Sequence, residues 1–373
     1  MPRSFAAGVS LLTLLTALLA LPARAHAAGG MEFALQDDAV FVDQRWMERA
    51  TALDHAADLR TKRIRVNVLW ARALVSGAKS RNVPAGGPVY DFSRIDALQA
   101  AAAERHIKLQ LTISGPAPAW ATKDRKVGNN APDAGMYGAF VRTVVSHFAG
   151  RVDRYAIWNE PNLSAWLSPG KSAGSLYRAL YAGGYANAKA ADPRAKVLFG
   201  ELAPVGGGRV IAPLKFLRDV TCSNAAYKAA KRCAPLKSDG FAIHPYQFLS
   251  APQIATGRPD DVPIGALSRL TTALDKLARR RALATPAKRP LDLYLTEFGY
   301  LTVGDRAQQP KVRAAWLASA VQIARRNPRV RQLLQYQLVD PPGDEVWHSA
   351  ILHRDGSPQA TYAGLAKATA ASG

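Results

Sequence analysis

The stretch "YAIWNEPNLSAW", residues 155–166, joins a short apolar run to a polar turn in which Glu160 stands between Asn159 and Pro161. Short apolar runs rich in β-branched and aromatic residues are typical of strands that are buried on both faces of a parallel sheet. Pro161 has no N–H group and therefore helps to end such a strand. The stretch predicts a buried parallel strand whose carboxyl end carries a polar functional group.

The same pattern of strand and helix recurs along the chain. The predicted strands are residues 31–35, 63–70, 107–114, 152–158, 195–200, 239–244, 291–298 and 331–339. The predicted helices are residues 44–60, 93–106, 137–150, 174–191, 214–219, 264–280, 312–326 and 360–370. Repeats of about 40 residues with this alternation predict an α/β fold, a closed (β/α)8 TIM barrel in a single domain. The alternative is an open doubly wound sheet, which would be expected to carry a glycine-rich turn after its first strand, where this chain has Gln36, Asp37 and Asp38.

The first residues predict a targeting segment. Arg3 precedes an apolar run over residues 5–21, and small-residue Ala-x-Ala sites end at Ala25 and Ala27. This order is typical of a secretory signal peptide over residues 1–27, with the barrel domain in residues 28–373. A membrane anchor is the alternative, but the apolar run is shorter than the roughly 20 residues of a spanning helix. We expect a secreted or extracytoplasmic protein with no membrane span after cleavage.

The two cysteines, Cys222 and Cys233, lie close together in a polar, lysine-rich stretch. In an oxidising compartment such a pair is expected to form a local disulfide. Two free thiols are the alternative, and the lack of a C-x-x-C motif argues against a redox or zinc role.

The chain of 373 residues has a formal net charge of +21. Such a charge attracts polyanions, including acidic glycans, and a polyanion-binding protein is one hypothesis. The positive charges are scattered, however, as expected for the solvated faces of outer helices. We therefore expect no nucleic-acid partner, and the sequence leaves the oligomeric state open.

Polar residues gather at the carboxyl ends of the predicted strands, where the active sites of barrels lie. Glu160 and Glu297 each end an apolar strand, three βα units apart, so they are expected to face each other across the mouth of the barrel. Two carboxylates that flank one bond are what glycoside hydrolysis needs, since one protonates the leaving oxygen and the other attacks the sugar or activates water. Aromatic side chains near the same ends, among them Trp120 and Trp347, could offer flat faces for sugar rings.

The motifs "WNEPN" and "TEFGY" resemble signatures of glycoside hydrolase clan A, the retaining (β/α)8 hydrolases, most closely family 39-like and family 5-like members. "RIRVNVLW", "YDFSRIDAL", "GPAPAW" and "HPY" are also similar to stretches of these enzymes. The resemblance covers nearly the whole chain after the predicted signal peptide. It implies a glycosidase that cleaves O-glycosidic bonds of a polysaccharide or glycoconjugate by double displacement. The predicted signal peptide adds the expectation that this enzyme is secreted, and the positive charge adds the expectation of an anionic substrate.

The resemblance also implies roles for single residues. Glu160 would be the general acid/base and Glu297 the nucleophile. Asn159 would bind the sugar 2-hydroxyl, Tyr246 would donate to the nucleophile, and Arg65 would lower its pKa. His244 would line the same pocket. The chain departs from the pattern at its eighth strand, where many clan members carry a tryptophan and this sequence has Tyr336.

Other readings stay open at this point. His244 could be a satisfied barrel histidine, and Trp120 and Trp347 could be ordinary packing residues. The whole protein could be a non-catalytic carbohydrate-binding barrel of the cell envelope. No HExxH motif or Cys/His cluster points to a metal, and we expect no cofactor.

Overall fold

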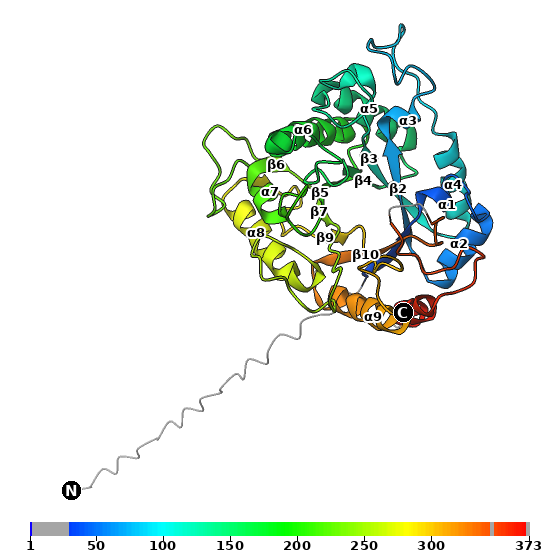
Figure 1. Cartoon of the computed structure of the whole chain (residues 1–373). Coiled ribbons are helices and arrows are strands. Elements are labelled where there is room, and N and C mark those ends of the chain that lie inside the picture. The colour runs from blue at the N-terminus through cyan, green and yellow to red at the C-terminus, as the bar shows by residue number, and fades with distance from the viewer. Residues whose placement is uncertain (2–29, 344–346, 371–373) are drawn as a thin grey trace.

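The computed structural model describes Met1 and residues 30–343 and 347–370, which form a closed parallel barrel surrounded by helices (Figure 1). The strands pair in the order β1-β10-β9-β7-β5-β4-β3-β2. They are β1 (Glu32–Gln36), β2 (Arg63–Leu69), β3 (Lys108–Ser114), β4 (Arg154–Ile157), β5 (Lys196–Leu202), β7 (Gly240–Ile243), β9 (Leu293–Leu295) and β10 (Val330–Tyr336). The predicted barrel is confirmed and the open sheet is excluded, because β1 pairs with both β2 and β10. The predicted signal peptide lies, apart from Met1, outside the described residues.

Helices follow the strands and cover the outside of the barrel. The longer ones are α2 (Arg49–Asp58), α4 (Ser93–Glu104), α5 (Ala134–Phe148), α6 (Ala173–Ala191), α7 (Pro213–Val220), α8 (Leu267–Arg279), α9 (Pro310–Arg326) and α10 (Ala360–Ala370). Shorter turns are α1 (Asp38–Phe41), α3 (Trp70–Ala73), η1 (Ala119–Ala121), η2 (Gly170–Ser172) and η3 (Ile264–Ala266). Each predicted helix is present, with ends that differ by a few residues.

Beyond Arg154, strand β4 is apolar because both of its faces are buried. On β4, Tyr155 and Ile157 belong to the large cluster of buried residues that packs under the helices. Ala156 alternates with them and forms a separate buried cluster with Leu198, Ala242 and Tyr294 from three other strands. Successive residues of a strand point to opposite faces, so this second cluster is a layer inside the barrel.

Tyrosines of the outer helices bind the backbone at the carboxyl ends of the strands. The Tyr137 hydroxyl of α5 donates to the Ile113 carbonyl at 2.5 Å, and the Tyr177 hydroxyl of α6 donates to the Ile157 carbonyl at 3.1 Å. Tyr177 also accepts from the Gly200 N–H at 2.9 Å. These buried bonds fix the ends of neighbouring strands relative to one another.

Two features outside the barrel are local. The strands β6 (Leu236–Lys237) and β8 (Leu283–Ala284) form a small parallel sheet that the sequence pattern did not predict. Cys222 and Cys233 form the predicted disulfide in the segment between α7 and β6, with their Cα atoms 6.2 Å apart.

Within the described residues, no helix combines the length and the apolar character that crossing a membrane requires.

Candidate active site

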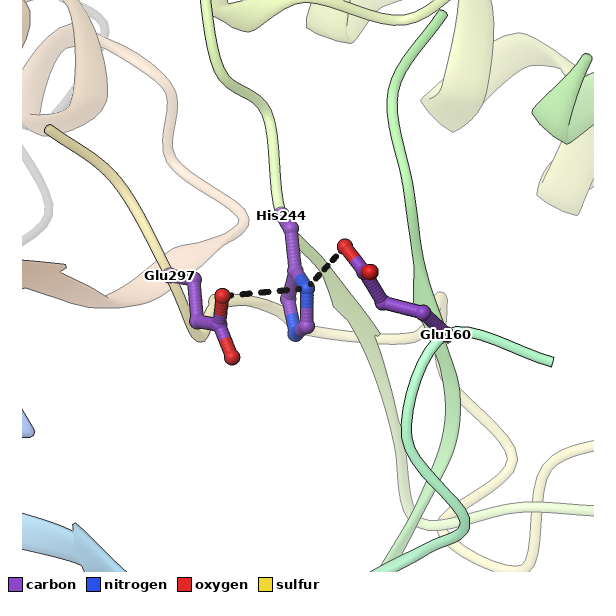
Figure 2. A group of neighbouring side chains, drawn as sticks. All are labelled: Glu160, His244 and Glu297. Atoms are coloured by element: carbon purple, nitrogen blue, oxygen red, sulfur yellow. Dashed lines mark hydrogen bonds and ion pairs between the residues drawn. The ribbon is translucent and has the colours of Figure 1, made fainter. Parts of the chain in front are cut away.

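The carboxyl ends of β4, β7 and β9 bring together three of the predicted side chains. Glu160, His244 and Glu297 each offer one ligand atom, and these atoms lie within 4.8 Å of one another. Figure 2 shows the imidazole of His244 between the two carboxylates. Its Nδ1 lies 2.9 Å from Glu160 Oε1 and 3.5 Å from Glu297 Oε2. The two glutamates that the sequence singled out therefore face a common space at the mouth of the barrel.

The turn after β4 holds Glu160 in a strained conformation. Its φ is 38°, in the left-handed region that non-glycine residues rarely adopt. The Glu160 N–H donates to the Glu201 carbonyl at 2.9 Å, and the Glu160 carbonyl accepts from the Leu163 N–H at 2.9 Å. Strain that its surroundings hold in place is common at functional sites.

Arg65 on β2 binds the two carboxylates next to it. Its Nη1 donates to Glu297 Oε1 at 2.7 Å, and its Nη2 donates to Glu201 Oε2 at 3.0 Å. Nη2 also donates to Asn159 Oδ1 at 2.7 Å. Because the Asn159 oxygen accepts from Arg65, the Asn159 Nδ2 group is the one suited to donate to a ligand.

Tyr246 binds the Glu297 oxygen that Arg65 does not bind. Its hydroxyl donates to Glu297 Oε2 at 3.2 Å. Its ring lies edge-on to Trp347, with the ring centroids 5.0 Å apart, and Trp347 in turn lies 6.5 Å from Tyr336. Trp347 thus lies at the mouth of the barrel beside the carboxylates, although it comes from the loop after β10.

Burial raises the pKa of Glu297 above its ordinary value. The positive charges of His244 and Arg65 lower it, and the negative charges of Glu160 and Glu201 raise it again. Arg65 therefore acts on the Glu297 pKa in the direction that the sequence predicted, but burial outweighs it.

At His244 the neighbouring charges outweigh the effect of burial on the pKa. Burial alone would lower its pKa, but the charge of Glu297 and the hydrogen bonds to Glu160 and Glu201 raise the pKa to about 10. Both ring nitrogens face carboxylate oxygens, as expected for an imidazolium that donates on both sides. Its contacts with three carboxylates, those of Glu160, Glu201 and Glu297, make His244 part of the charged site rather than an isolated barrel histidine.

Trp120 packs into the buried core. It is 4% exposed and packs edge-on against Trp70, with the ring centroids 5.5 Å apart. Both rings belong to the large buried cluster. A contact between Trp120 and substrate stays a prediction.

Glu201 and the threonines that bind it were not among the site residues predicted from the sequence. The Glu201 carboxylate accepts from Thr296 Oγ1 at 2.8 Å and from Thr112 Oγ1 at 3.4 Å, and Arg65 Nε donates to Thr112 at 2.9 Å. Arg65 also donates to Gln36. The sequence offered one clue to these threonines: Thr112 and Thr296 lie near the ends of strands that carry other site residues.

Glu160, His244 and Glu297 are close enough to be considered as metal ligands. A histidine binds a metal through a deprotonated nitrogen, and both His244 nitrogens lie next to carboxylate oxygens. The guanidinium of Arg65 already bonds to Glu297. The donor set fits a network of charged hydrogen bonds better than a cation site.

A cavity of about 1120 Å³ lies next to the Glu160 turn. Ser164 and residues 206–212 line it, and the Ser164 N–H donates to the Arg209 carbonyl at 2.9 Å. Lys171 and Arg209 also line the cavity. Residues 206–212 follow β5, so the cavity opens on the same end of the barrel as the carboxylates.

No family model and no curated protein sequence matches the chain. Solved structures do match it. A family 39 glycoside hydrolase from Bacteroides cellulosilyticus WH2 is similar with a TM-score of 0.65 and 18% identity over 92% of this chain, which spans 64% of the length of that protein. A glucosidase from Croceicoccus marinus is similar with a TM-score of 0.63 and 14% sequence identity. The match covers 92% of this chain and 69% of that protein.

A monomeric β-xylosidase from Caulobacter crescentus CB15 gives a TM-score of 0.57 and 19% identity, covering 91% of this chain and 69% of that one. At such identities the likeness shows the fold alone. The chain shares the (β/α)8 barrel of these glycoside hydrolases.

Proposed function

We propose that this protein is a secreted, retaining glycoside hydrolase that cleaves O-glycosidic bonds of a polysaccharide or glycoconjugate. The observation that carries the proposal is the separation of the two carboxylates, with an oxygen of Glu160 within 4.8 Å of an oxygen of Glu297. Retaining glycosidases hold their carboxyl groups about 5–5.5 Å apart, whereas inverting enzymes leave about 6.5–9.5 Å for a water molecule. The (β/α)8 glycosidases with similar folds add weight to the same reaction class.

In the first step Glu297 attacks the anomeric carbon as the glycosidic C–O bond breaks, and the leaving oxygen takes the proton of Glu160. In the second step water attacks the same carbon, Glu160 takes the water proton, and Glu297 is released. Arg65 and Tyr246 hold the Glu297 carboxylate with bonds of 2.7 and 3.2 Å. Asn159 would bind the 2-hydroxyl of the sugar through Nδ2.

Export has separate support. The Cys222–Cys233 disulfide is the kind of bond that persists in oxidising compartments. Together with the signal-like sequence of residues 1–27, it favours a secreted enzyme. N-terminal sequencing of the protein from the culture medium tests this, and retention of full-length chain inside the cell would contradict it.

Glu160→Gln tests the general acid. The variant should lose about 10²- to 10⁴-fold in kcat on glycosides with poor leaving groups, because general acid catalysis is worth that much. On dinitrophenyl glycosides, whose leaving group needs no proton, the rate of the first step should fall far less. Glu104→Gln, an exposed glutamate at the end of α4, is the matched control and should keep wild-type rates.

A 2-fluoro glycoside should trap a covalent adduct, and peptide mapping should find it on Glu297. An adduct on another residue would refute the assigned nucleophile. If wild type and Glu160→Gln both bind glycans and neither cleaves any, the protein is a carbohydrate-binding barrel instead.

We extend the proposal to the kind of substrate: we propose that the part of the substrate that lies in the cavity next to the Glu160 turn carries negative charge. Three other cations at or beside the cavity are neutralised, since Lys215 pairs with Asp219, Arg258 with Asp261 and Arg218 with Asp260. Within residues 30–343 and 347–370, no ion pair or side-chain hydrogen bond is found for Lys171 or Arg209. These two cations are free to meet an anionic sugar in the cavity.

The double variant Lys171→Ala/Arg209→Ala should raise KM for acidic oligosaccharides and leave neutral aryl glycosides unaffected. Arg142→Ala/Lys367→Ala removes the same charge from exposed positions on α5 and α10 and is the matched control. Equal effects of both double variants would show that only the net charge matters.

A further inference from the structure

The end of β5 turns a glutamate into the barrel. The pairing of β5 with β7 shifts its register between Gly200 and Leu202, and Glu201 lies at the shift. Gly200 has a φ of 119° and Glu201 a φ of 53°. Such bulges re-aim side chains and are common next to active sites. The conformation places the Glu201 side chain among the catalytic candidates.

The Glu201 carboxylate is completely buried and fully bonded. It is 0% exposed, as are Arg65 and His244. His244 Nε2 lies 2.7 Å from Glu201 Oε2, and Arg65 Nη2 donates to the same oxygen at 3.0 Å. A carboxylate so deep in a protein persists only when opposite charges and donors surround it.

Each cation on Glu201 also reaches one of the two catalytic candidates. His244 carries the link to Glu160 through Nδ1 at 2.9 Å, as Figure 2 shows. Arg65 carries the link to Glu297 through Nη1 at 2.7 Å. The backbone adds a third link, because the Glu201 carbonyl accepts from the Glu160 N–H at 2.9 Å. The Glu201 side chain is 0% exposed and does not reach solvent.

We propose that Glu201 is a positioning residue of this site, which holds His244 against Glu160 and Arg65 against Glu297. The proposal rests on the glycosidase function proposed above. Glu201 supplies the negative charge that keeps both cations in place, so the carboxylates that do the chemistry are held at their short separation.

The charges around Glu201 agree with this role. Burial raises the pKa of Glu201, but Arg65 and His244 outweigh burial and hold the pKa below its ordinary value. The charged groups that face Glu201 are Arg65 from β2, His244 from the end of β7 and Glu297 from the end of β9. Removing the Glu201 charge leaves His244 with less to stabilise its proton.

Glu201→Gln tests the proposal, because it keeps the shape and removes the charge. We expect kcat on an aryl glycoside to fall about 10- to 100-fold with little change in KM, the loss that goes with one charged hydrogen-bond partner. His244 should stay protonated to about pH 9 in the wild type, given its pKa of about 10. In the variant His244 should titrate at lower pH, as ¹⁵N spectra of the imidazole nitrogens would show.

Glu32→Gln is the matched control, since Glu32 is also a carboxylate that binds two arginines, Arg63 and Arg154, but at the other end of the barrel. It should lower the melting temperature without changing kcat or the titration of His244. A folded Glu201→Gln with wild-type kcat and a wild-type His244 titration would overturn the proposal. If Glu201→Gln does not fold, Glu201→Asp decides: a lowered kcat supports positioning, and a wild-type kcat refutes it.

The experiment separates this proposal from the function on which it rests. If the wild type cleaves no glycoside, the glycosidase function fails, and the titration of His244 in Glu201→Gln still decides whether Glu201 holds it. If the wild type is active, both readouts apply.

Discussion

Glu201 and Glu297 both bind Arg65 at the mouth of the barrel, yet their pKa values move in opposite directions. Burial raises both. At Glu201 the positive charges and hydrogen bonds of Arg65, His244 and Thr296 outweigh it. At Glu297 they do not, because the negative charges of Glu160 and Glu201 add to the effect of burial. The number and sign of the neighbours, rather than residue type, set the behaviour of each carboxylate.

Glu297→Gln should abolish turnover and stabilise the fold. The folded-state pKa of Glu297 is raised, so wild-type stability is greatest below its ordinary pKa and falls as the pH rises and the carboxylate ionises. The variant lacks this loss. Its melting temperature should match wild type near pH 4 and exceed it by about 2–4 °C at pH 8, a shift that about 1 kcal/mol produces in a large domain. A lower melting temperature at pH 8 would contradict the assigned direction.

At the scale of the element, β5 depends on one glycine. A Cβ on Gly200 would lie 2.3 Å from the Ala242 carbonyl oxygen of β7, and its φ of 119° is strained for any other residue. The backbone of β7 cannot give way without breaking the barrel pairing. The segment "FGEL" therefore aims Glu201 correctly only with glycine at this position.

Gly200→Ala should destabilise the fold by about 3 kcal/mol or more, from backbone strain and overpacking together. It should also lower kcat, because Glu201 moves with it. Gly150→Ala is the matched control: Gly150 has a φ of 76° but open space around its Cβ position, so it should lose only about 1 kcal/mol. Urea unfolding of both variants checks this, and equal losses would show that the contact with β7 is unimportant.

At the scale of the whole molecule, the pKa shifts of the carboxylates differ between the two ends of the barrel. At the amino end, burial raises the pKa of Glu32, but Arg154 and Arg63 outweigh it and hold the pKa below its ordinary value. At the mouth, burial raises the pKa of Asp37 to about 7 and also raises the pKa values of Asp38 and Glu297, whereas Arg65 and His244 hold the pKa of Glu201 below its ordinary value. Ion pairs at the amino end favour stability, whereas raised pKa values gather at the end that carries the proposed chemistry.

Glu32→Gln should destabilise the protein by about 3 kcal/mol at pH 7, because it leaves Arg63, only 1% exposed, with one partner fewer. The folded-state pKa of Glu32 is lowered, so its contribution is present above its ordinary pKa and disappears as the pH falls through the folded-state value. The difference between variant and wild type in urea unfolding should therefore shrink towards pH 3. A difference that is constant with pH would exclude the ion pairs as its cause.

The strands, the helices and the two glutamates could be predicted from the sequence because each leaves a local pattern. Apolar runs mark buried strands, and Glu160 and Glu297 stand where such runs end. The role of Glu201 could not be predicted in the same way. Its partners Arg65, His244 and Thr296 lie 136, 43 and 95 residues away in the chain, and no local pattern records those contacts.

The sequence by itself determined the barrel, its succession of apolar strands and the strand ends where a site could form. Periodicity and turn chemistry are short-range properties of the chain, which is why they can be read directly. Only the tertiary structure decided that Glu201 turns inward, that His244 lies between two carboxylates and that Trp120 packs into the core. Those outcomes depend on barrel closure, which brings distant residues together in a largely buried space, where charge and burial act together.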